Sequence, residues 1–262
     1  MTSINIGGAE IQYQDKGNGA VVLFLHGFPL SLAMWDGQEA LASRNRVVRF
    51  DARGFGQSQV GDSLLTMDRI ADDAAVLIEK LRLGPVILAG CSMGGYAAFS
   101  FVRKHAPLLR GLILVDTRAG ADTQDARISR RELAGRVGRE GARVAMESFL
   151  PKTLGETTKK SRADVVAKVK DMMLATPPQA IVNALNGLAA RSDSTPTLRE
   201  ITVPTLIVCG EEDVLTPVLE SEKMQREIKG SELVVIPKSG HLPSMETPDE
   251  FNALVSAFLS RF

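Results

Sequence analysis

The chain has 262 residues, of which 44% are hydrophobic and 24% charged, which is typical of a globular protein with a substantial core and excludes a disordered one. Its 31 basic and 31 acidic side chains balance, so no strong field would recruit nucleic acid or an anionic membrane. We therefore expect the partner to be a small, largely neutral molecule, with no nucleic acid and no membrane involved.

Location in the cell is predicted from what the sequence lacks. No run of residues is long and apolar enough to span a bilayer, and residues 1–16 lack the charged start and apolar middle of a secretory signal. We therefore expect a cytoplasmic protein.

Short apolar runs recur along the chain and alternate with helical patterns. This alternation predicts an α/β fold, in which helices cover both faces of a mostly parallel sheet. Near the start, Gly7-Gly8 separates two short β-type runs and suggests a hairpin at the sheet edge. The apolar runs that we interpret as buried strands are 21–25, 47–50, 85–89, 112–115, 205–208 and 233–236.

Between these runs, residues 67–81, 95–105 and 217–229 show helical patterns. The last helix has the clearest start, because Thr247 precedes a proline and Glu250 follows three residues later. This spacing predicts a capping box, in which Thr247 caps a helix that runs to about residue 260.

Residues 119–191 interrupt the alternation, because they contain helical patterns and charge but no convincing strand. We predict that they form a helical cap, or lid, inserted into a core domain made of residues 1–118 and 192–262. Most apolar side chains of this segment should pack the cap onto the core, and a minority should line a pocket. They include Leu133, Val137, Met146, Phe149, Leu150, Met172, Met173, Leu174, Ile181, Leu185 and Leu188.

The strongest motif is Gly90-Cys91-Ser92-Met93-Gly94, which fits G-x-S-x-G between a predicted strand and a predicted helix. A serine in so sharp a turn has strained backbone angles, and small residues are needed two positions before and after it. The turn would lift the Ser92 hydroxyl above the sheet, and the start of the next helix would favour a developing anion. Ser92 is therefore the candidate nucleophile, while Cys91 should point away from the cleft.

A serine hydroxyl needs a base, and the chain offers three histidines. His105 lies at a charged helix end and His26 in a loop after a strand, where we expect a surface role and a loop hydrogen bond. His241 remains, in a loop after the last strand. The chain order serine, acid, histidine supports it as the base.

The acid should follow the predicted strand 205–208, where Gly210-Glu211-Glu212-Asp213 lies. We choose Asp213, which would fix the tautomer of the histidine and stabilise its charged form. Glu211 and Glu212 are expected to be solvated. Asp116, at the end of an earlier strand, is the best alternative.

Attack on an ester creates an oxyanion, which two backbone N–H groups should receive. One N–H follows the nucleophile, at Met93. The other should belong to Phe28 in His26-Gly27-Phe28-Pro29, where the glycine allows a close turn.

These motifs, together with the turn 51–58 and Gly240-His241, resemble those of the α/β-hydrolase superfamily over essentially the whole chain. Within it, the chain is most similar to bacterial serine carboxylesterases related to 3-oxoadipate enol-lactonases. The resemblance implies an eight-stranded sheet in the order 1-2-4-3-5-6-7-8 with only the second strand antiparallel. In that order another strand separates Cys91 from Cys209 by about 9 to 10 Å, so both should be free thiols.

The resemblance also carries the family's catalytic positions over to Ser92, Asp213 and His241, and its oxyanion positions to Phe28 and Met93. It implies a structural role for the turn 51–58, and we expect no cofactor and no metal. Haloalkane dehalogenases and epoxide hydrolases share the fold but carry aspartate at the position of the serine, which argues against their chemistry.

These residues predict a carboxylic ester hydrolase that acts on short-chain esters through an acyl-enzyme. Lactone hydrolysis of the enol-lactonase type uses the same groups and is the nearest alternative, although an anionic lactone would require an arginine facing the pocket. A ligand-binding receptor on the same fold is an alternative of a different class. Perhydrolysis or cofactor-free halogenation would be a side activity of the same site.

Overall fold

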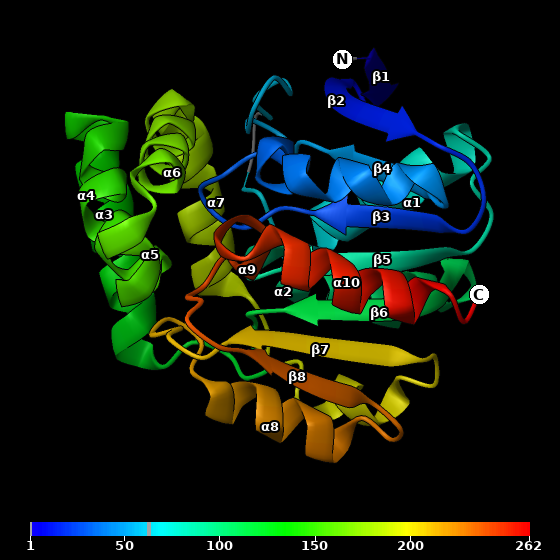
Figure 1. The fold of residues 1–262 in the computed structure, drawn as a ribbon. Coiled ribbons are helices and arrows are strands. Elements are labelled where there is room, and N and C mark those ends of the chain that lie inside the picture. Colours follow the sequence, from blue (N-terminus) through cyan, green and yellow to red (C-terminus); the bar gives the residue numbers. More distant parts are fainter. Residues whose placement is uncertain (1, 62–63) are drawn as a thin grey trace.

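The computed structural model describes residues 2–61 and 64–262. One sheet of eight strands has the order β1-β2-β4-β3-β5-β6-β7-β8, which confirms the order that the resemblance implies (Figure 1). β2 is antiparallel to β1 and β4, and all other neighbours pair in parallel. The strands are β1 Thr2–Ile6, β2 Ala9–Lys16, β3 Val21–Leu25, β4 Arg46–Phe50, β5 Val86–Cys91, β6 Leu109–Val115, β7 Thr205–Gly210 and β8 Glu232–Ile236.

Burial explains why the inner strands are visible in the sequence. Every residue of β3, β5 and β7 is buried, so each strand is a continuous apolar run. β8 differs from the expectation of burial on both faces, since Val235 is 38% exposed and only the last residue of the strand is buried. The reason is its place at the sheet edge, where it pairs with β7 alone.

Helices cover both faces of the sheet, as expected. On one face, α1 (Met67–Lys80) packs on α2 (Met93–His105), and α8 (Val218–Glu227) contacts β7 and β8. On the other face, α10 (Pro248–Leu259) packs against the 3-10 segment η1 (Leu32–Ser43). Two shorter 3-10 segments, η2 and η3, span Ala106–Leu108 and Pro196–Glu200.

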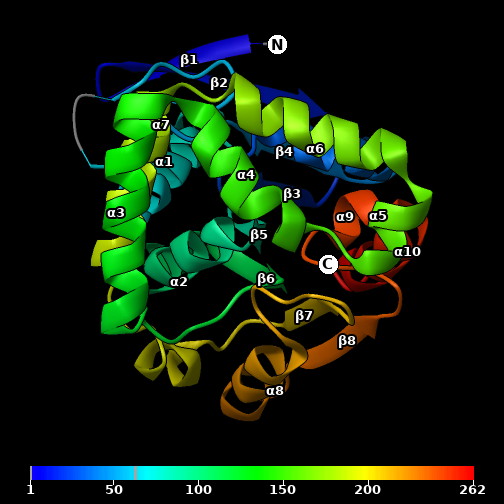
Figure 2. The same ribbon diagram turned by 90° about the vertical axis from the view of Figure 1, so that its left-hand side faces the viewer.

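Five helices follow one another between β6 and β7, and we call residues 124–190 the helical segment. Figures 1 and 2 show this segment beyond the carboxyl ends of the parallel strands. Within it α3 packs on α7 and α4 on α6. Most of its apolar side chains pack as expected, Val137 and Ile181 among them, whereas Leu174 is 38% exposed. The helices are α3 Gln124–Glu140, α4 Ala142–Thr153, α5 Glu156–Ser161, α6 Ala163–Ala175 and α7 Pro178–Ala190.

The capping box predicted at Thr247 is wrong, although the helix itself forms almost as expected. α10 begins at Pro248 and ends at Leu259, but the Thr247 side chain accepts no hydrogen bond from the helix start. A short helix, α9 (Pro243–Glu246), ends just before it, and the Thr247 hydroxyl donates to the carbonyl of Pro243 instead. The carbonyl of Pro243, one helical turn back, thus binds the hydroxyl that would otherwise cap α10.

Cys91 ends β5 and Cys209 lies in β7, and β6 runs between these two strands. Both thiols are free and buried, as the strand order implies. In the part of the chain that the structure describes, no helix combines the length and apolar character needed to cross a membrane.

Candidate active site

Ser92 occupies a strained turn between β5 and α2. Its backbone angles are φ +52° and ψ −110°, in a region that L-residues rarely adopt. The neighbouring glycines are required by space: a Cβ added at Gly90 would lie 2.4 Å from the carbonyl oxygen of Gly94, and one at Gly94 would lie 2.3 Å from that of Leu25. The turn therefore has the geometry that the motif predicts.

The start of α2 supplies part of the electrostatics at this turn. Met93 is the first residue of the helix, so its N–H has no acceptor within the helix. The N-terminus of a helix carries a partial positive charge, which favours an anion beside it. Negative charge developing next to Ser92 would be stabilised there.

Asp213 and His241 form a buried pair. Oδ2 of Asp213 lies 2.7 Å from Nδ1 of His241, and both residues are at most 4% exposed. Thr216 supports the carboxylate, since its N–H donates to Oδ1 at 3.1 Å and its hydroxyl donates to Oδ2 at 2.6 Å. The N–H of Leu215 also donates to Oδ1, at 2.8 Å.

These contacts keep Asp213 ionised. Burial alone would raise the pKa of this carboxyl, but the charge of His241 and hydrogen bonds from His241 and Thr216 lower it well below its usual range. A carboxylate at Nδ1 leaves Nε2 as the ring nitrogen that can exchange a proton with a substrate or a nucleophile.

The loop that carries His241 is held by Glu246, a buried carboxylate that no sequence motif marks. Its Oε1 accepts the N–H groups of Gly240 and Leu242, each at 3.0 Å, and its Oε2 accepts the N–H of Gly155 at 2.9 Å. The N–H of His241 donates in addition to the carbonyl of Thr153, at 3.1 Å. The histidine loop is thus tied to the helical segment through main-chain groups.

Ser92 and His241 line the same cavity, which has a volume of about 150 Å³. Among the residues that the structure describes, no hydrogen bond joins the Ser92 hydroxyl to the imidazole; such bonds are often long in a resting enzyme and shorten in the substrate complex. The cavity is lined by Phe28, Ser92, Met93, Tyr96, Arg118, Arg130, Phe149, Leu188, Leu215, Thr216 and His241. Phe149 and Leu188 belong to the minority of apolar residues expected to line a pocket.

Both residues predicted to supply oxyanion donors also line this cavity. The hydrogen bonds of the described residues include none from the N–H of Phe28, which leaves that donor free. Gly27 differs from the expectation, because an added Cβ would meet its nearest neighbours at an ordinary 3.5 Å. The close turn before Phe28 therefore does not depend on glycine.

The other two histidines have structural partners. His26 is buried, with Nε2 accepting the N–H of Ala52 at 3.0 Å and Nδ1 lying 2.9 Å from the carbonyl of Gly27, so it joins its own loop to the turn 51–58. Burial lowers the pKa of His26, which keeps the ring neutral. His105 ends α2 and pairs with Asp72 at 2.8 Å. Both roles agree with the sequence analysis.

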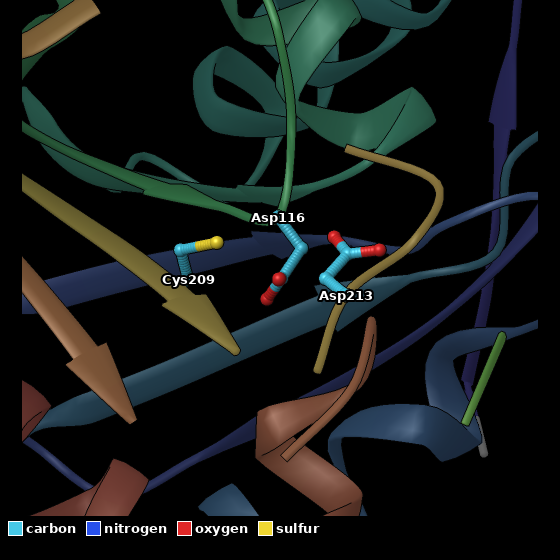
Figure 3. Close-up of side chains that lie close together, drawn as sticks. All are labelled: Asp116, Cys209 and Asp213. Atoms are coloured by element: carbon cyan, nitrogen blue, oxygen red, sulfur yellow. The ribbon is translucent and has the colours of Figure 1, made fainter. Parts of the chain in front are cut away.

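The alternative acids do not reach His241. Glu211 is exposed, as expected, whereas Glu212 is half-buried, and its carboxylate accepts from the N–H of Thr157 at 2.8 Å and from the Thr157 hydroxyl at 2.5 Å. The start of α5 thus holds the Glu212 carboxylate, which stays partly exposed. Asp116 is fully buried and lies beside Asp213 (Figure 3), and the hydrogen bonds of the described residues include none between Asp116 and the His241 ring.

An arginine cluster around Asp122 borders the cavity and was not identified from the sequence. Asp122 has a fully buried carboxylate, which accepts from Arg118 at 2.7 Å, Arg130 at 2.5 Å and Arg191 at 3.0 Å. Burial alone would raise the pKa of Asp122, but the guanidinium groups of Arg130 and Arg191 lower it to about 2. Three cations thus share one anion, and two of them line the cavity of Ser92.

A second, larger cavity of about 360 Å³ is also lined by Tyr96. Arg191 lines it, with its guanidinium 4.1 Å from the centre of the Tyr96 ring. Neither Ser92 nor His241 borders this cavity, so the smaller one is the candidate active site.

Comparison with known proteins agrees with this architecture. A family model described as alpha/beta hydrolase fold matches residues 20–248. The chain is 32% identical to the AB hydrolase superfamily protein YisY of Bacillus subtilis, over 94% of this chain and 93% of the relative. It is 28% identical to 3-oxoadipate enol-lactonase 1 of Acinetobacter baylyi, over 95% and 92%.

Among solved structures, a thermophilic esterase from Thermogutta terrifontis, determined with malate bound, is 42% identical to this chain. The match has a TM-score of 0.95 and covers 99% of this chain and 97% of the esterase. From the matched family model, the sheet order and the turn at Ser92, we conclude that the chain belongs to the α/β-hydrolase family.

Proposed function

We propose that the protein hydrolyses carboxylic esters through an acyl-enzyme on Ser92. The observation that carries this proposal is the buried Asp213–His241 pair, 2.7 Å apart, in the cavity that the strained serine also lines. A hydroxyl, an imidazole and a buried carboxylate in this order form the constellation used for acyl transfer on many unrelated folds. The relatives include an esterase, which supports the same chemistry.

The reaction uses each group in turn. Ser92 Oγ attacks the ester carbonyl carbon while Nε2 of His241 takes the hydroxyl proton, and Asp213 stabilises the imidazolium. The N–H groups of Phe28 and Met93 donate to the oxyanion. The carbon–oxygen bond then breaks, and the alcohol leaves with the proton from His241. Water repeats the attack on the acyl-enzyme, with the same base, and releases the acid.

The size of the cavity supports short acyl groups. Its volume of about 150 Å³ is small, and Phe28, Phe149, Leu188 and Leu215 form an apolar part of its wall. Two aromatic rings, Phe28 and Phe149, meet edge to face with centres 5.2 Å apart. Such a wall accepts a short alkyl chain better than a long one.

The experiment is to compare the Ser92→Ala variant with the wild-type protein on a short aryl ester. We expect a loss of kcat on the order of 10⁶, by analogy with other serine triads, with an unchanged circular dichroism spectrum. Labelling by a fluorophosphonate should occur in the wild type and disappear in the variant. A wild-type protein that neither reacts with the probe nor hydrolyses the ester would favour the ligand-binding alternative.

A second candidate is hydrolysis of a lactone or ester that carries its own carboxylate. Arg118 and Arg130 favour it, because they place excess positive charge in the wall of the cavity. One relative is an enol-lactonase, and the esterase was determined with malate bound. A neutral ethyl ester and the monoethyl ester of a short dicarboxylic acid separate the two: a higher kcat/KM for the anionic monoester supports the second candidate.

We also propose that residues 119–191 act as a cap over this cavity, with residues 1–118 and 192–262 as the core domain. Arg130 of α3, Phe149 of α4 and Leu188 of α7 support it, since all three line the cavity together with Ser92 and His241. Exchanging Leu188 for Phe should reduce kcat/KM more for long acyl chains than for acetate esters, whereas equal effects on all chain lengths would argue against a cap that limits the substrate.

A further inference from the structure

Asp116 is a buried carboxyl group that the proposed reaction does not use. It follows β6, is 0% exposed and has a left-handed backbone with φ +41°. Its Oδ1 accepts the N–H of Gly210 at 2.9 Å. Its Oδ2 is buried and accepts no hydrogen bond from the described residues. A bare buried oxygen of this kind calls for a proton or a cation.

The nearest polar side chains are those of Asp213 and Cys209. Figure 3 shows the three groups together where β6 and β7 end, and one polar atom of each lies within 4.8 Å of the others. Glu246 is the other charged group that acts on Asp116, and the thiol of Cys91 lies in the neighbouring strand β5. Two ionised carboxyls so close together in a buried site would repel each other strongly.

Hydrogen bonds decide which carboxyl is neutral. Asp213 accepts four of them, two from backbone N–H groups, one from Thr216 and one from His241, whereas Asp116 accepts one. Donors stabilise the charged form, so the negative charge belongs on Asp213. Burial raises the pKa of Asp116 well above its usual range, and the charges of Asp213 and Glu246 raise it further.

The chemistry of the donors does not fit a metal ion at this place. Cys209 would have to be a thiolate, but burial raises the pKa of this thiol well above its ordinary value. Its sulfur also lies at donor distance from the carbonyls of Gly210 and Thr216, at 3.4 and 3.8 Å. Asp213 is already occupied by four donors. A proton on Oδ2 of Asp116 satisfies this oxygen without displacing the donors of Asp213 or ionising Cys209, as a metal ion would require.

We propose that Asp116 is a neutral carboxylic acid whose Oδ2–H donates a hydrogen bond to the Asp213 carboxylate, so that the acid of the candidate triad is a carboxyl–carboxylate pair with one negative charge. The part of this proposal that concerns catalysis rests on the proposed function, while the protonation of Asp116 does not. Asp116 is a positioning residue: it contacts Asp213 and acts on the reaction only through it.

Two consequences follow for His241. A fifth donor fixes the Asp213 carboxylate in the orientation that faces Nδ1. It also withdraws charge from that carboxylate, so the imidazolium is stabilised less than it would be by an isolated aspartate. Without the Asp116 donor, the acidic limb of the kcat/KM profile should move to higher pH, because His241 would hold its proton more strongly.

The test compares two variants that both tolerate a left-handed backbone. Asp116→Asn keeps an acceptor for Gly210 and an N–H donor for Asp213, whereas Asp116→Gly removes both. We expect the glycine variant to lose about 10- to 100-fold in kcat/KM, the usual effect of losing a hydrogen bond to a charged group, and to shift the acidic limb upward. The asparagine variant should keep most of the wild-type kcat/KM, and the acidic limb of its pH profile should lie close to that of the wild type.

The protonation state is measured separately from activity. At pH 7, infrared difference spectra of wild type against Asp116→Asn should contain the carbonyl band of one protonated carboxyl. Absence of that band, or an asparagine variant as impaired as the glycine variant, would overturn the proposal. Stoichiometric metal in the purified wild type that is missing from Asp116→Asn would overturn it as well. If the band of the protonated carboxyl is present but the wild-type protein has no esterase activity, the proposed function is wrong and the carboxyl–carboxylate pair is still supported.

Discussion

Nδ1 of His241 lies 2.7 Å from Oδ2 of Asp213, across 28 residues of chain that include α8 and β8. Two loops at neighbouring strand ends make this contact possible. They approach closely, since a Cβ added at Gly210 would lie 1.9 Å from the carbonyl oxygen of Gly240. The sheet order therefore places Asp213 and His241 side by side.

The carboxylate charge on Asp213 should be needed for turnover. In Asp213→Asn the amide can present an N–H to the histidine and favour the wrong tautomer, so we expect kcat to fall on the order of 10³ to 10⁴ with little change in KM. Glu211→Gln is the matched control, because that exposed side chain belongs to the same loop. Steady-state kinetics on a short aryl ester check this, and a retained kcat in Asp213→Asn would exclude the triad.

Glu246 should stabilise both the fold and the histidine loop. Its carboxylate accepts three main-chain N–H groups, and the amide nitrogen of a glutamine would face one of these donors without an acceptor. We expect Glu246→Gln to lower the free energy of unfolding by about 1 to 3 kcal/mol and to lower kcat, because the His241 loop relaxes. Urea denaturation measures the first effect. Glu250→Gln, exposed at the start of α10, should change neither quantity.

The sheet and the three candidate catalytic residues could be predicted because they depend on local or repeated patterns. Buried parallel strands are continuous apolar runs. Ser92 sits in a turn that requires glycines, because a Cβ added at Gly90 or Gly94 would lie 2.3 to 2.4 Å from a backbone carbonyl oxygen. Asp213 and His241 follow strands β7 and β8, so the topology alone brings their loops to one edge.

The arginine cluster could not be predicted in the same way. Arg118, Arg130 and Arg191 come from a loop after β6, from α3 and from the end of α7, and they meet only because α3 packs on α7. Helical periodicity marks which side of a helix is polar, but it does not say which neighbour that side will meet. The same limit applies to Glu212, whose partner Thr157 lies 55 residues away in the chain.

Asp122 should make stability depend on pH in the acid range. Its pKa is lowered from 3.8 to about 2 in the folded protein, so folding favours the ionised form. The resulting stabilisation, about 2 kcal/mol, is complete above the unfolded pKa and is lost as the pH falls from about 4 to about 2. The free energy of unfolding is measured by urea denaturation at pH 7, 5, 4 and 3. The difference in this free energy between wild type and Asp122→Asn should stay constant from pH 7 to 5 and decrease at pH 4 and 3. A difference in unfolding free energy that stays constant down to pH 3 would contradict a stabilising role of the ion pairs of Asp122.

The tight packing around the turn at Ser92 should exclude any side chain at position 94. An alanine Cβ would lie 2.3 Å from the carbonyl oxygen of Leu25, which is backbone and cannot rotate away. We expect Gly94→Ala to lower the free energy of unfolding by about 1 to 3 kcal/mol, as overpacking usually does, and to disturb Ser92. Gly120→Ala is the control, since nothing lies within 4 Å of its added Cβ and a change of at most about 0.5 kcal/mol is expected. Equal stabilities of the two variants would refute the steric account.

Arg130 should select substrates by charge. Its guanidinium lines the cavity of Ser92 and projects from α3, where the neighbouring Arg131 is exposed and provides a control. If the cluster receives a substrate carboxylate, Arg130→Gln should raise KM for an anionic monoester about tenfold, because one charge-assisted hydrogen bond is lost, while KM for the matching neutral ester stays the same. Arg131→Gln should affect neither substrate. An equal loss on both esters would mean that Arg130 supports the wall of the cavity through Asp122, and a preference for the neutral ester in the wild type would remove the case for anionic substrates.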